Sequence, residues 1–177
     1  MDSSSLETLR GAVRDVPDFP QAGILFKDIT PVLADPKLLD LAISSMVDQG
    51  GIREVDKVVG VDARGFIFGA LIAQKLGAGF IPVRKKGKLP WKTKGVDYAL
   101  EYGSAHIEIH EDAIRPGETV LLADDLLATG GTAAAALELI EALGGKLLGS
   151  LFFIELSFLQ GREKLASTAP VHALISY

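Results

Sequence analysis

The stretch that decides the fold is Thr119–Thr132, which reads TVLLADDLLATGGT. Its first five residues have the apolar character of a buried strand, which is expected to end at the adjacent carboxylates of Asp124 and Asp125. A loop of small residues follows, and residues 133–143 have the composition of a helix. This order of strand, glycine-containing loop and helix is typical of α/β proteins, in which ligands bind beyond the carboxyl ends of the strands.

The loop after the two carboxylates has the features of a phosphate site. Backbone N–H groups of small residues can close around an anion, and the positive end of the following helix points at the same place. Asp124 and Asp125 would repel a phosphate, but carboxylates accept hydrogen bonds from hydroxyl groups or hold a divalent metal through water. A phosphate beside a vicinal diol describes a ribose 5-phosphate. The loop residues expected to hold the phosphate are Ala128, Thr129, Gly130, Gly131 and Thr132.

This stretch resembles the signature for 5-phosphoribosyl diphosphate (PRPP) in the type I phosphoribosyltransferases, in the wording found in adenine phosphoribosyltransferases. The resemblance extends from about residue 16 to residue 165 and covers four motifs in the expected order. It implies an α/β fold with a central, mostly parallel twisted sheet flanked by helices. It also implies a small N-terminal hood over residues 1–34 and a flexible lid over residues 84–103.

Composition limits the class of protein further. The 177 residues suit a single domain spanning 1–177, and the net charge of −5 would repel nucleic acid and anionic membranes from most of the surface. The chain has no cysteine, which excludes disulfides, thiolate metal sites and cysteine nucleophiles. No segment resembles a signal peptide or a membrane span, so we expect a cytoplasmic protein without nucleic-acid or membrane partners.

Short apolar runs alternate with helical stretches along the chain, which is the pattern of a doubly wound sheet. Asp35 is a predicted N-cap, because Pro36 at the first helical position follows it. Residues 84–103 show no periodicity, which is typical of a functional lid or a disordered stretch. We predict strands at residues 57–61, 80–83, 104–109, 120–123 and 147–154, and helices at residues 6–13, 36–49, 66–76 and 133–143.

A second strand, loop and helix occupies residues 58–69, which read VVGVDARGFIFG. Arg64 in this turn could reach a phosphate, and Gly65 would permit a close approach of the backbone. Taken alone, an arginine near a helix start is more often a solvated charge. The resemblance makes this the pyrophosphate loop, including Asp62 and Ala63, between which related enzymes often have a cis peptide bond.

Six of the 18 basic residues gather in residues 84–94, RKKGKLPWKTK, although the chain as a whole is acidic. Such a concentration of cations beside two phosphate loops favours binding or steering of a diphosphate. The resemblance places Arg84, Lys85 and Lys88 at positions that contact pyrophosphate, some of them across a dimer interface. It therefore implies a homodimer.

The resemblance also assigns residues around the base. Glu101 matches a lid residue that interacts with the imidazole edge of the purine and is the candidate general acid or base, and Tyr102 is expected to pack over the closed lid. In the hood, Phe26 would stack on adenine, while backbone groups near Leu25 and Lys27 would read its Watson–Crick edge. Many relatives carry arginine at the position of Lys27, but the expected contact uses the backbone.

The sequence thus predicts transfer of the phosphoribosyl group from PRPP to adenine, giving AMP and pyrophosphate, with Arg64 and Glu101 acting in catalysis. Mg²⁺ is expected to bind mainly through PRPP, pyrophosphate and water, and no protein residue is predicted as a metal ligand. One alternative is a 6-oxopurine phosphoribosyltransferase, whose Glu-Asp pair and shorter loop fit poorly. The other is a PRPP-sensing regulator that binds nucleic acid, which the net charge of −5 disfavours.

Near the end of the chain, Glu155 and residues 162–164 carry charges within an otherwise apolar context. They are interpreted as ordinary charge on a closing strand and helix, although this segment also follows the family wording.

Overall fold

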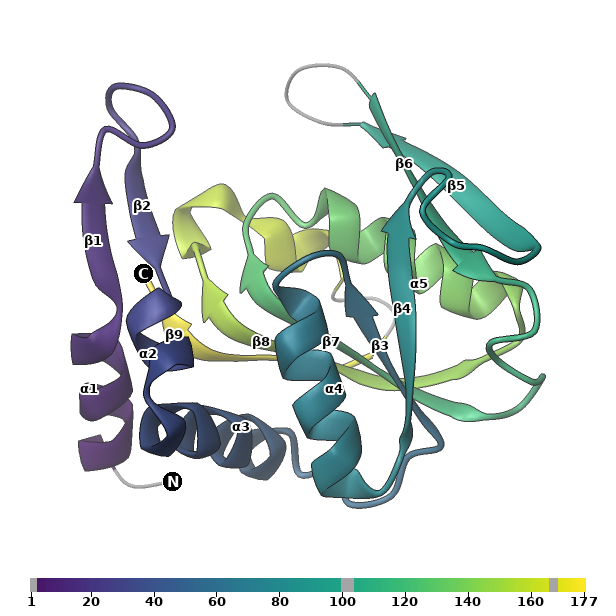
Figure 1. The fold of residues 1–177 in the computed structure, drawn as a ribbon, viewed down its shortest axis with the longest axis horizontal. Coiled ribbons are helices and arrows are strands. Elements are labelled where there is room, and N and C mark those ends of the chain that lie inside the picture. Colours follow the sequence, from purple (N-terminus) through teal and green to yellow (C-terminus); the bar gives the residue numbers. More distant parts are fainter. Residues whose placement is uncertain (1–2, 100–103, 166–168) are drawn as a thin grey trace.

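The computed structural model describes residues 3–99, 104–165 and 169–177, which form a seven-stranded sheet, helices on both of its faces and a separate two-stranded hairpin (Figure 1). The strands of the sheet are β3 (Lys57–Val61), β4 (Gly79–Lys85), β5 (Thr93–Ala99), β6 (Ser104–His110), β7 (Thr119–Leu127), β8 (Lys146–Glu155) and β9 (Val171–Ser176). Their order across the sheet is β5-β6-β4-β3-β7-β8-β9. Neighbouring strands in the series β4-β3-β7-β8-β9 pair in parallel. Strand β6 pairs antiparallel with both β4 and β5. The predicted α/β fold with a mostly parallel sheet is confirmed.

Helices cover both faces of this sheet. On one face lie α1 (Ser3–Ala12), α2 (Thr30–Ala34), α3 (Pro36–Gly50) and α4 (Gly65–Leu76), and on the other lies α5 (Gly131–Ala142). The predicted cap of α3 is confirmed, because Asp35 Oδ1 accepts hydrogen bonds from Lys37 N at 2.8 Å and Leu38 N at 3.2 Å. Two 3₁₀ helices, η1 (Ser157–Leu159) and η2 (Gly161–Lys164), follow β8.

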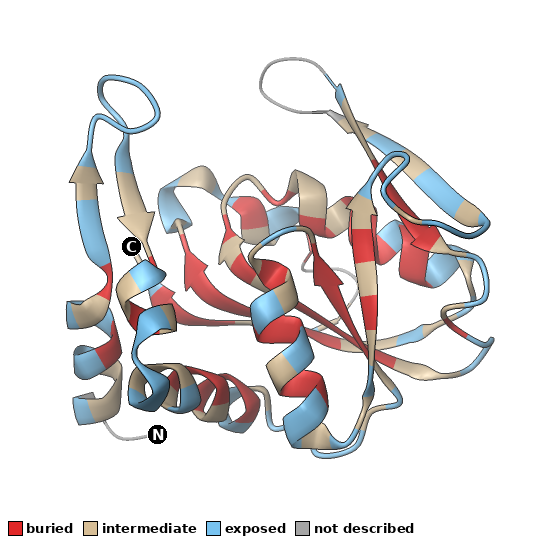
Figure 2. Ribbon diagram, viewed as in Figure 1, coloured by how far each residue is buried: buried red, intermediate tan, exposed pale blue. Residues whose placement is uncertain are grey.

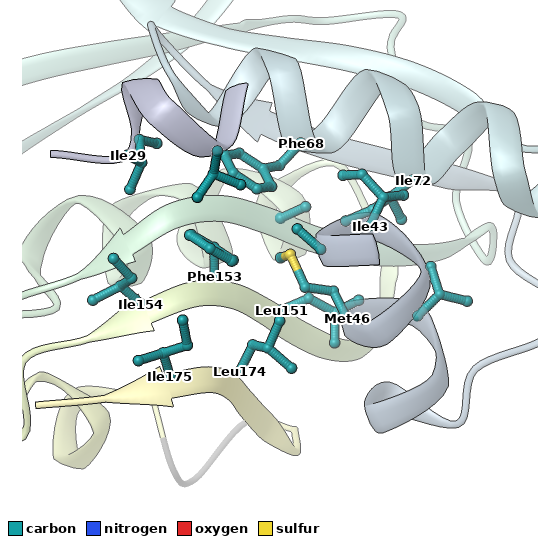
Figure 3. Packing of buried hydrophobic residues seen from close by; sticks show 14 of the residues in the cluster. Ile29, Ile43, Met46, Phe68, Ile72, Leu151, Phe153, Ile154, Leu174 and Ile175 are labelled. Carbon is teal, nitrogen blue, oxygen red and sulfur yellow. The ribbon is translucent and has the colours of Figure 1, made fainter. Parts of the chain in front are cut away.

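The two faces of the sheet bury two separate hydrophobic clusters. Alternate residues of β7 point to opposite faces, so Leu121 packs with the α3 and α4 side and Leu122 with the α5 side. Figure 2 shows the central strands as mostly buried, and Figure 3 shows the packing on the α3 side. There the rings of Phe68 and Phe153 stack with 5.3 Å between their centroids. Burying one such side chain contributes about 1.5–3 kcal/mol to the free energy of folding. Many such side chains together hold the helices firmly against the sheet.

Several strands differ from the prediction. The hairpin of β1 (Arg14–Pro17) and β2 (Leu25–Asp28), and the strands β5 and β9, were not predicted. In addition, β7 does not end at the two carboxylates but continues to Leu127, because its pairing with β8 extends to the register Leu127–Glu155. Pairing with a neighbouring strand therefore lengthens β7 beyond its apolar run.

The carboxyl ends of β3, β4, β7 and β8 point to the same edge of the sheet, and the β1–β2 and β5–β6 hairpins rise on either side of it (Figure 1). In the described part of the chain, no helix combines the length and the apolar character that a membrane span requires.

Candidate active site

A cavity of about 320 Å³ lies at this edge, between the ends of β3 and β7 and the start of α5. It brings together two loops that are about sixty residues apart in the sequence, and Val61, Leu126, Leu127 and Ala133 complete its lining. Ten residues predicted for the site line it: Asp62, Ala63, Arg64, Asp124, Asp125, Ala128, Thr129, Gly130, Gly131 and Thr132.

The loop at the start of α5 is shaped to present its backbone to this cavity. Gly130 has a φ of +76°, a left-handed conformation that favours glycine, and its carbonyl accepts the first helical hydrogen bond from Ala134 N at 2.9 Å. Among the described residues, no side chain caps the first turn of α5. Its N–H groups therefore remain available for an anion.

Strand β5 also contacts this loop, through Tyr98. Thr132 Oγ1 donates a hydrogen bond to Tyr98 Oη over 3.1 Å. Tyr98 was not predicted as a site residue, and no local sequence signal identifies it, because its place depends on how β5 pairs with β6. The apolar lining residues Leu126 and Leu127 were also missed, since they resemble ordinary strand residues.

The two carboxylates lie at the centre of the cavity and are joined to Arg64. Arg64 Nε lies 2.7 Å from Asp125 Oδ2, and Asp125, which is 6% exposed, donates its backbone N–H to Asp124 Oδ1 over 2.9 Å. Burial, followed by repulsion from Asp125, raises the pKa of Asp124 well above its ordinary value. Burial also raises the pKa of Asp125, and the charge of Arg64 opposes that rise.

A glycine makes room for this arrangement. A Cβ atom at Gly65 would overlap Asp124 Oδ1, so only glycine at the start of α4 lets the carboxylate sit against the helix. The close approach of the Gly65 backbone to a phosphate stays a prediction.

The pyrophosphate loop is tied to the basic segment. The Asp62–Ala63 peptide bond is cis, and Asp62 Oδ2 accepts a hydrogen bond from Arg84 Nε at 3.0 Å. Arg84 Nη1 also donates to the carbonyl of Lys88 over 3.0 Å. Arg84 therefore lies next to the cavity, whereas Lys85 and Lys88 are exposed and do not line it.

The hood approaches the cavity through one aromatic residue. The ring centroid of Phe26 lies 5.5 Å from the guanidinium carbon of Arg64, within the range of a cation–π contact. Lys27 Nζ lies 2.6 Å from Asp15 Oδ1 and 3.9 Å from the ring centroid of Tyr177. Leu25 is 50% exposed, and none of the three hood residues lines the cavity.

Two predicted residues, Glu101 and Tyr102, lie outside the described residues, so their roles stay predictions. A metal ion would need ligands from the protein, the substrate or water. The described ranges contain no group of three or more His, Asp or Glu residues placed to bind an ion. The adjacent Asp124 and Asp125 could contact Mg²⁺ only as part of a set completed by substrate oxygens and water.

One interpretation of the sequence is wrong. Glu155 is not an ordinary charge on a closing strand, because it is only 6% exposed and forms an ion pair with Arg162. Arg162 Nε and Nη2 donate to Glu155 Oε1 and Oε2 over 3.1 and 2.6 Å, and Arg162 Nη1 donates to the carbonyl of Val171. These bonds join η2 to the last residue of β8 and the first residue of β9.

Proteins of known family are similar to this chain in both sequence and fold. The sequence family of the phosphoribosyl transferase domain matches residues 37–173. The chain is 53% identical over 172 residues to adenine phosphoribosyltransferase of Nitrosococcus oceani, covering 97% of this chain and 100% of that protein. The crystal structure of adenine phosphoribosyltransferase from Rhodothermus marinus, at 53% identity, superposes with a TM-score of 0.94 over 99% of this chain and 100% of that one. The Saccharomyces cerevisiae enzyme, solved with an imino-altritol bisphosphate and adenine, has 43% identity and a TM-score of 0.91, covering 98% and 99% of the two chains.

Proposed function

This chain belongs to the phosphoribosyltransferase family, and from that premise we propose that it transfers the 5-phosphoribosyl group of PRPP to adenine, giving AMP and pyrophosphate. The observation that carries the proposal is the single cavity lined by both predicted loops. One loop suits a 5-phosphate and a ribose, and the other suits a diphosphate, so the cavity has the parts that PRPP requires.

The 5-phosphate binds the loop Ala128–Thr132. The first turn of α5 has no side-chain cap and lines the cavity there, and the helix dipole favours a negative charge. The ribose hydroxyls donate hydrogen bonds to Asp124 and Asp125, which also add negative potential beside the carbon that becomes cationic.

Pyrophosphate binds the opposite loop. Arg64 supplies a guanidinium for the leaving group, and Arg84 holds Asp62 in place from the basic segment. Mg²⁺ would be held mainly by diphosphate oxygens and water, and would neutralise charge on the diphosphate.

The reaction needs stabilisation of the charge on the leaving diphosphate and exclusion of water, rather than a protein nucleophile. The bond from the ribose anomeric carbon to the diphosphate oxygen breaks, and a bond from that carbon to a ring nitrogen of adenine forms. A cationic ribosyl centre develops between these events, and water must be kept from it. The proton on the attacking nitrogen leaves, and Glu101 is the proposed acceptor, at the lid that would close over the substrates.

Adenine binds between the hood and the cavity. Phe26 lies on the hood strand β2 beside Arg64, which places an aromatic face near the pyrophosphate loop. Backbone groups near Leu25 and Lys27 would read the edge of the base. The homodimer, in which some of Arg84, Lys85 and Lys88 would contact pyrophosphate across the interface, remains a prediction from the resemblance. The cytoplasmic location also remains a prediction.

The test is to incubate the protein with PRPP, Mg²⁺ and adenine and to quantify AMP and pyrophosphate. We expect the two products in equal amounts. Binding of PRPP without AMP, together with salt-sensitive binding of RNA, would instead indicate a regulator built on this fold.

A further inference from the structure

The phosphate loop makes a backbone-to-backbone contact with a distant turn. Gly161, at the start of η2, lies so close that a Cβ atom there would overlap the carbonyl oxygen of Ala128 and sit 2.8 Å from Gly130 N. In the other direction, a Cβ atom at Gly130 would overlap the carbonyl oxygen of Gly161. The loop and the turn therefore touch without any side chain between them.

The two glycines are required for different reasons. Gly130 has a positive φ, so glycine is favoured there even without a neighbour. Gly161 does not have a positive φ, so its backbone conformation would tolerate alanine. What excludes a side chain at Gly161 is the contact with the phosphate loop, which makes this residue a specific probe of that contact.

The turn that carries Gly161 is itself fixed from two sides. The fork from Arg162 to Glu155, with the further bond to the carbonyl of Val171, ties it to the last residue of β8 and the first residue of β9. Leu165, at the far end of η2, is fully buried in the cluster on the α5 side of the sheet. Gln160, in a left-handed conformation with a φ of +54°, turns the chain into η2. A rigid turn thus presents the Gly161 backbone to the loop.

We propose that residues 160–165, here called the Gly161 turn, form a positioning element that holds the phosphate loop in the conformation that accepts the 5-phosphate. The proposal rests on the proposed function, because it assumes that Ala128–Thr132 binds this group. Gly161 is a positioning residue, since it acts through Ala128 and Gly130 and does not line the cavity. Arg162 and Glu155 hold the turn in place.

A methyl group at Gly161 would push on the carbonyl of Ala128 and the N–H of Gly130. Because the turn is fixed by Arg162 and Leu165, the loop would have to move, and its N–H groups would lose their alignment on the phosphate. The effect should fall on ligands that carry the 5-phosphate, which are PRPP and AMP. Pyrophosphate, bound at Arg64, should be affected much less.

The experiment compares AMP and Mg²⁺-pyrophosphate affinities by calorimetric titration, with wild type, Gly161→Ala and Gly149→Ala. Gly149 is a matched control: it is buried in β8 with a backbone carbonyl 3.2 Å from its Cβ position, but it lies away from the cavity. We expect Gly161→Ala to weaken AMP binding by about tenfold or more, consistent with displaced hydrogen bonds to a charged group. Pyrophosphate affinity should change by less than about threefold, and the Michaelis constant should rise for PRPP more than for adenine. Gly149→Ala should keep the wild-type ratio of the two affinities even if it lowers the melting temperature.

Two results would overturn the inference. One is a folded Gly161→Ala variant with the wild-type ratio of AMP to pyrophosphate affinity. The other applies if that variant does not fold: Arg162→Lys, which keeps the charge but loses the fork to Glu155, should then lower the same ratio, and an unchanged ratio would refute the proposal. Failure of the proposed function is a different outcome, because wild type itself would then not bind AMP.

Discussion

Arg64 Nε lies 2.7 Å from Asp125 Oδ2, so the residue proposed for pyrophosphate and a residue proposed for the ribose are joined directly. The pair neutralises a carboxylate that is only 6% exposed. A guanidinium has five N–H donors and a carboxylate has two oxygens, so Arg64 can bind diphosphate oxygens and Asp125 can bind ribose hydroxyls beside this contact. The cavity is therefore organised around charges that already satisfy one another.

Replacing Asp125 with asparagine tests the ribose role. Asp125→Asn keeps the shape of the side chain but removes the charge that accepts the ribose hydroxyls. Hydrogen bonds to charged groups contribute about 1.5–3 kcal/mol, so PRPP and AMP should bind roughly ten- to a hundredfold more weakly, as measured by calorimetry. Asp48→Asn, at an exposed ion pair with Arg53, is the control and should leave both affinities unchanged. Lower thermal stability with unchanged affinities would show that Asp125 has only a structural role.

Asp124 should make stability depend on pH. Burial, followed by repulsion from Asp125, raises its pKa in the folded protein well above the ordinary 3.8, so between these two pKa values the folded state binds more protons than the unfolded chain. The stability from this group is fully present below about pH 3.8 and is lost as the pH rises toward the folded pKa. Asparagine at this position cannot ionise. The free energy of unfolding of Asp124→Asn, relative to that of wild type, should therefore increase as the pH rises from 4. Urea unfolding across pH 4–8 measures this, and a difference that stays constant with pH would contradict it.

A general acid or base role predicts a specific effect of Glu101→Gln. The turnover number should fall by about 10²–10⁴-fold, the usual contribution of a positioned proton-transfer group, while the affinity for PRPP changes little. Steady-state kinetics with a separate PRPP titration would check this. Glu111→Gln, at an exposed residue after β6, is the control. An unchanged turnover in Glu101→Gln would remove this residue from the proton transfer.

Tyr177 should affect the Michaelis constant for adenine rather than that for PRPP. Its ring lies beneath Lys27 Nζ, at 3.9 Å, and the guanidinium carbon of Arg10, at 4.8 Å, so it connects the hood strand β2 and helix α1 to the end of β9. Loss of a cation–π contact costs about 0.5–1 kcal/mol at exposed sites. Tyr177→Leu should therefore raise the Michaelis constant for adenine two- to fivefold (approximately, on the same basis) and leave that for PRPP unchanged. An equal rise in both constants would argue against a role confined to the hood.

The loop in Thr119–Thr132 could be predicted because its signal is local: an apolar run, two carboxylates and glycines occur within one short stretch. The turn at Arg64 is weak evidence on its own, and its assignment needed the first motif and the family resemblance. The helices follow from periodicity, whereas the cap at Asp35 follows from a capping residue directly before Pro36.

The remaining parts depend on pairing between distant segments. Strand β5 has no regular alternation, and it forms because seven of its residues pair with β6. The hood strands are four residues long and are defined only by each other. The fork between Arg162 and Glu155 and the contact of Gly161 with the phosphate loop likewise depend on the assembled sheet, so the charges near the end of the chain could not be distinguished from surface charge in the sequence.

The most direct test of the account is the specificity constant for adenine, hypoxanthine and guanine, measured side by side with PRPP and Mg²⁺. We predict a strong preference for adenine, because backbone groups near Leu25 and Lys27 would read a base whose exocyclic amine donates and whose ring nitrogen accepts. Preferred turnover of hypoxanthine or guanine would contradict this account of the hood and indicate a 6-oxopurine phosphoribosyltransferase.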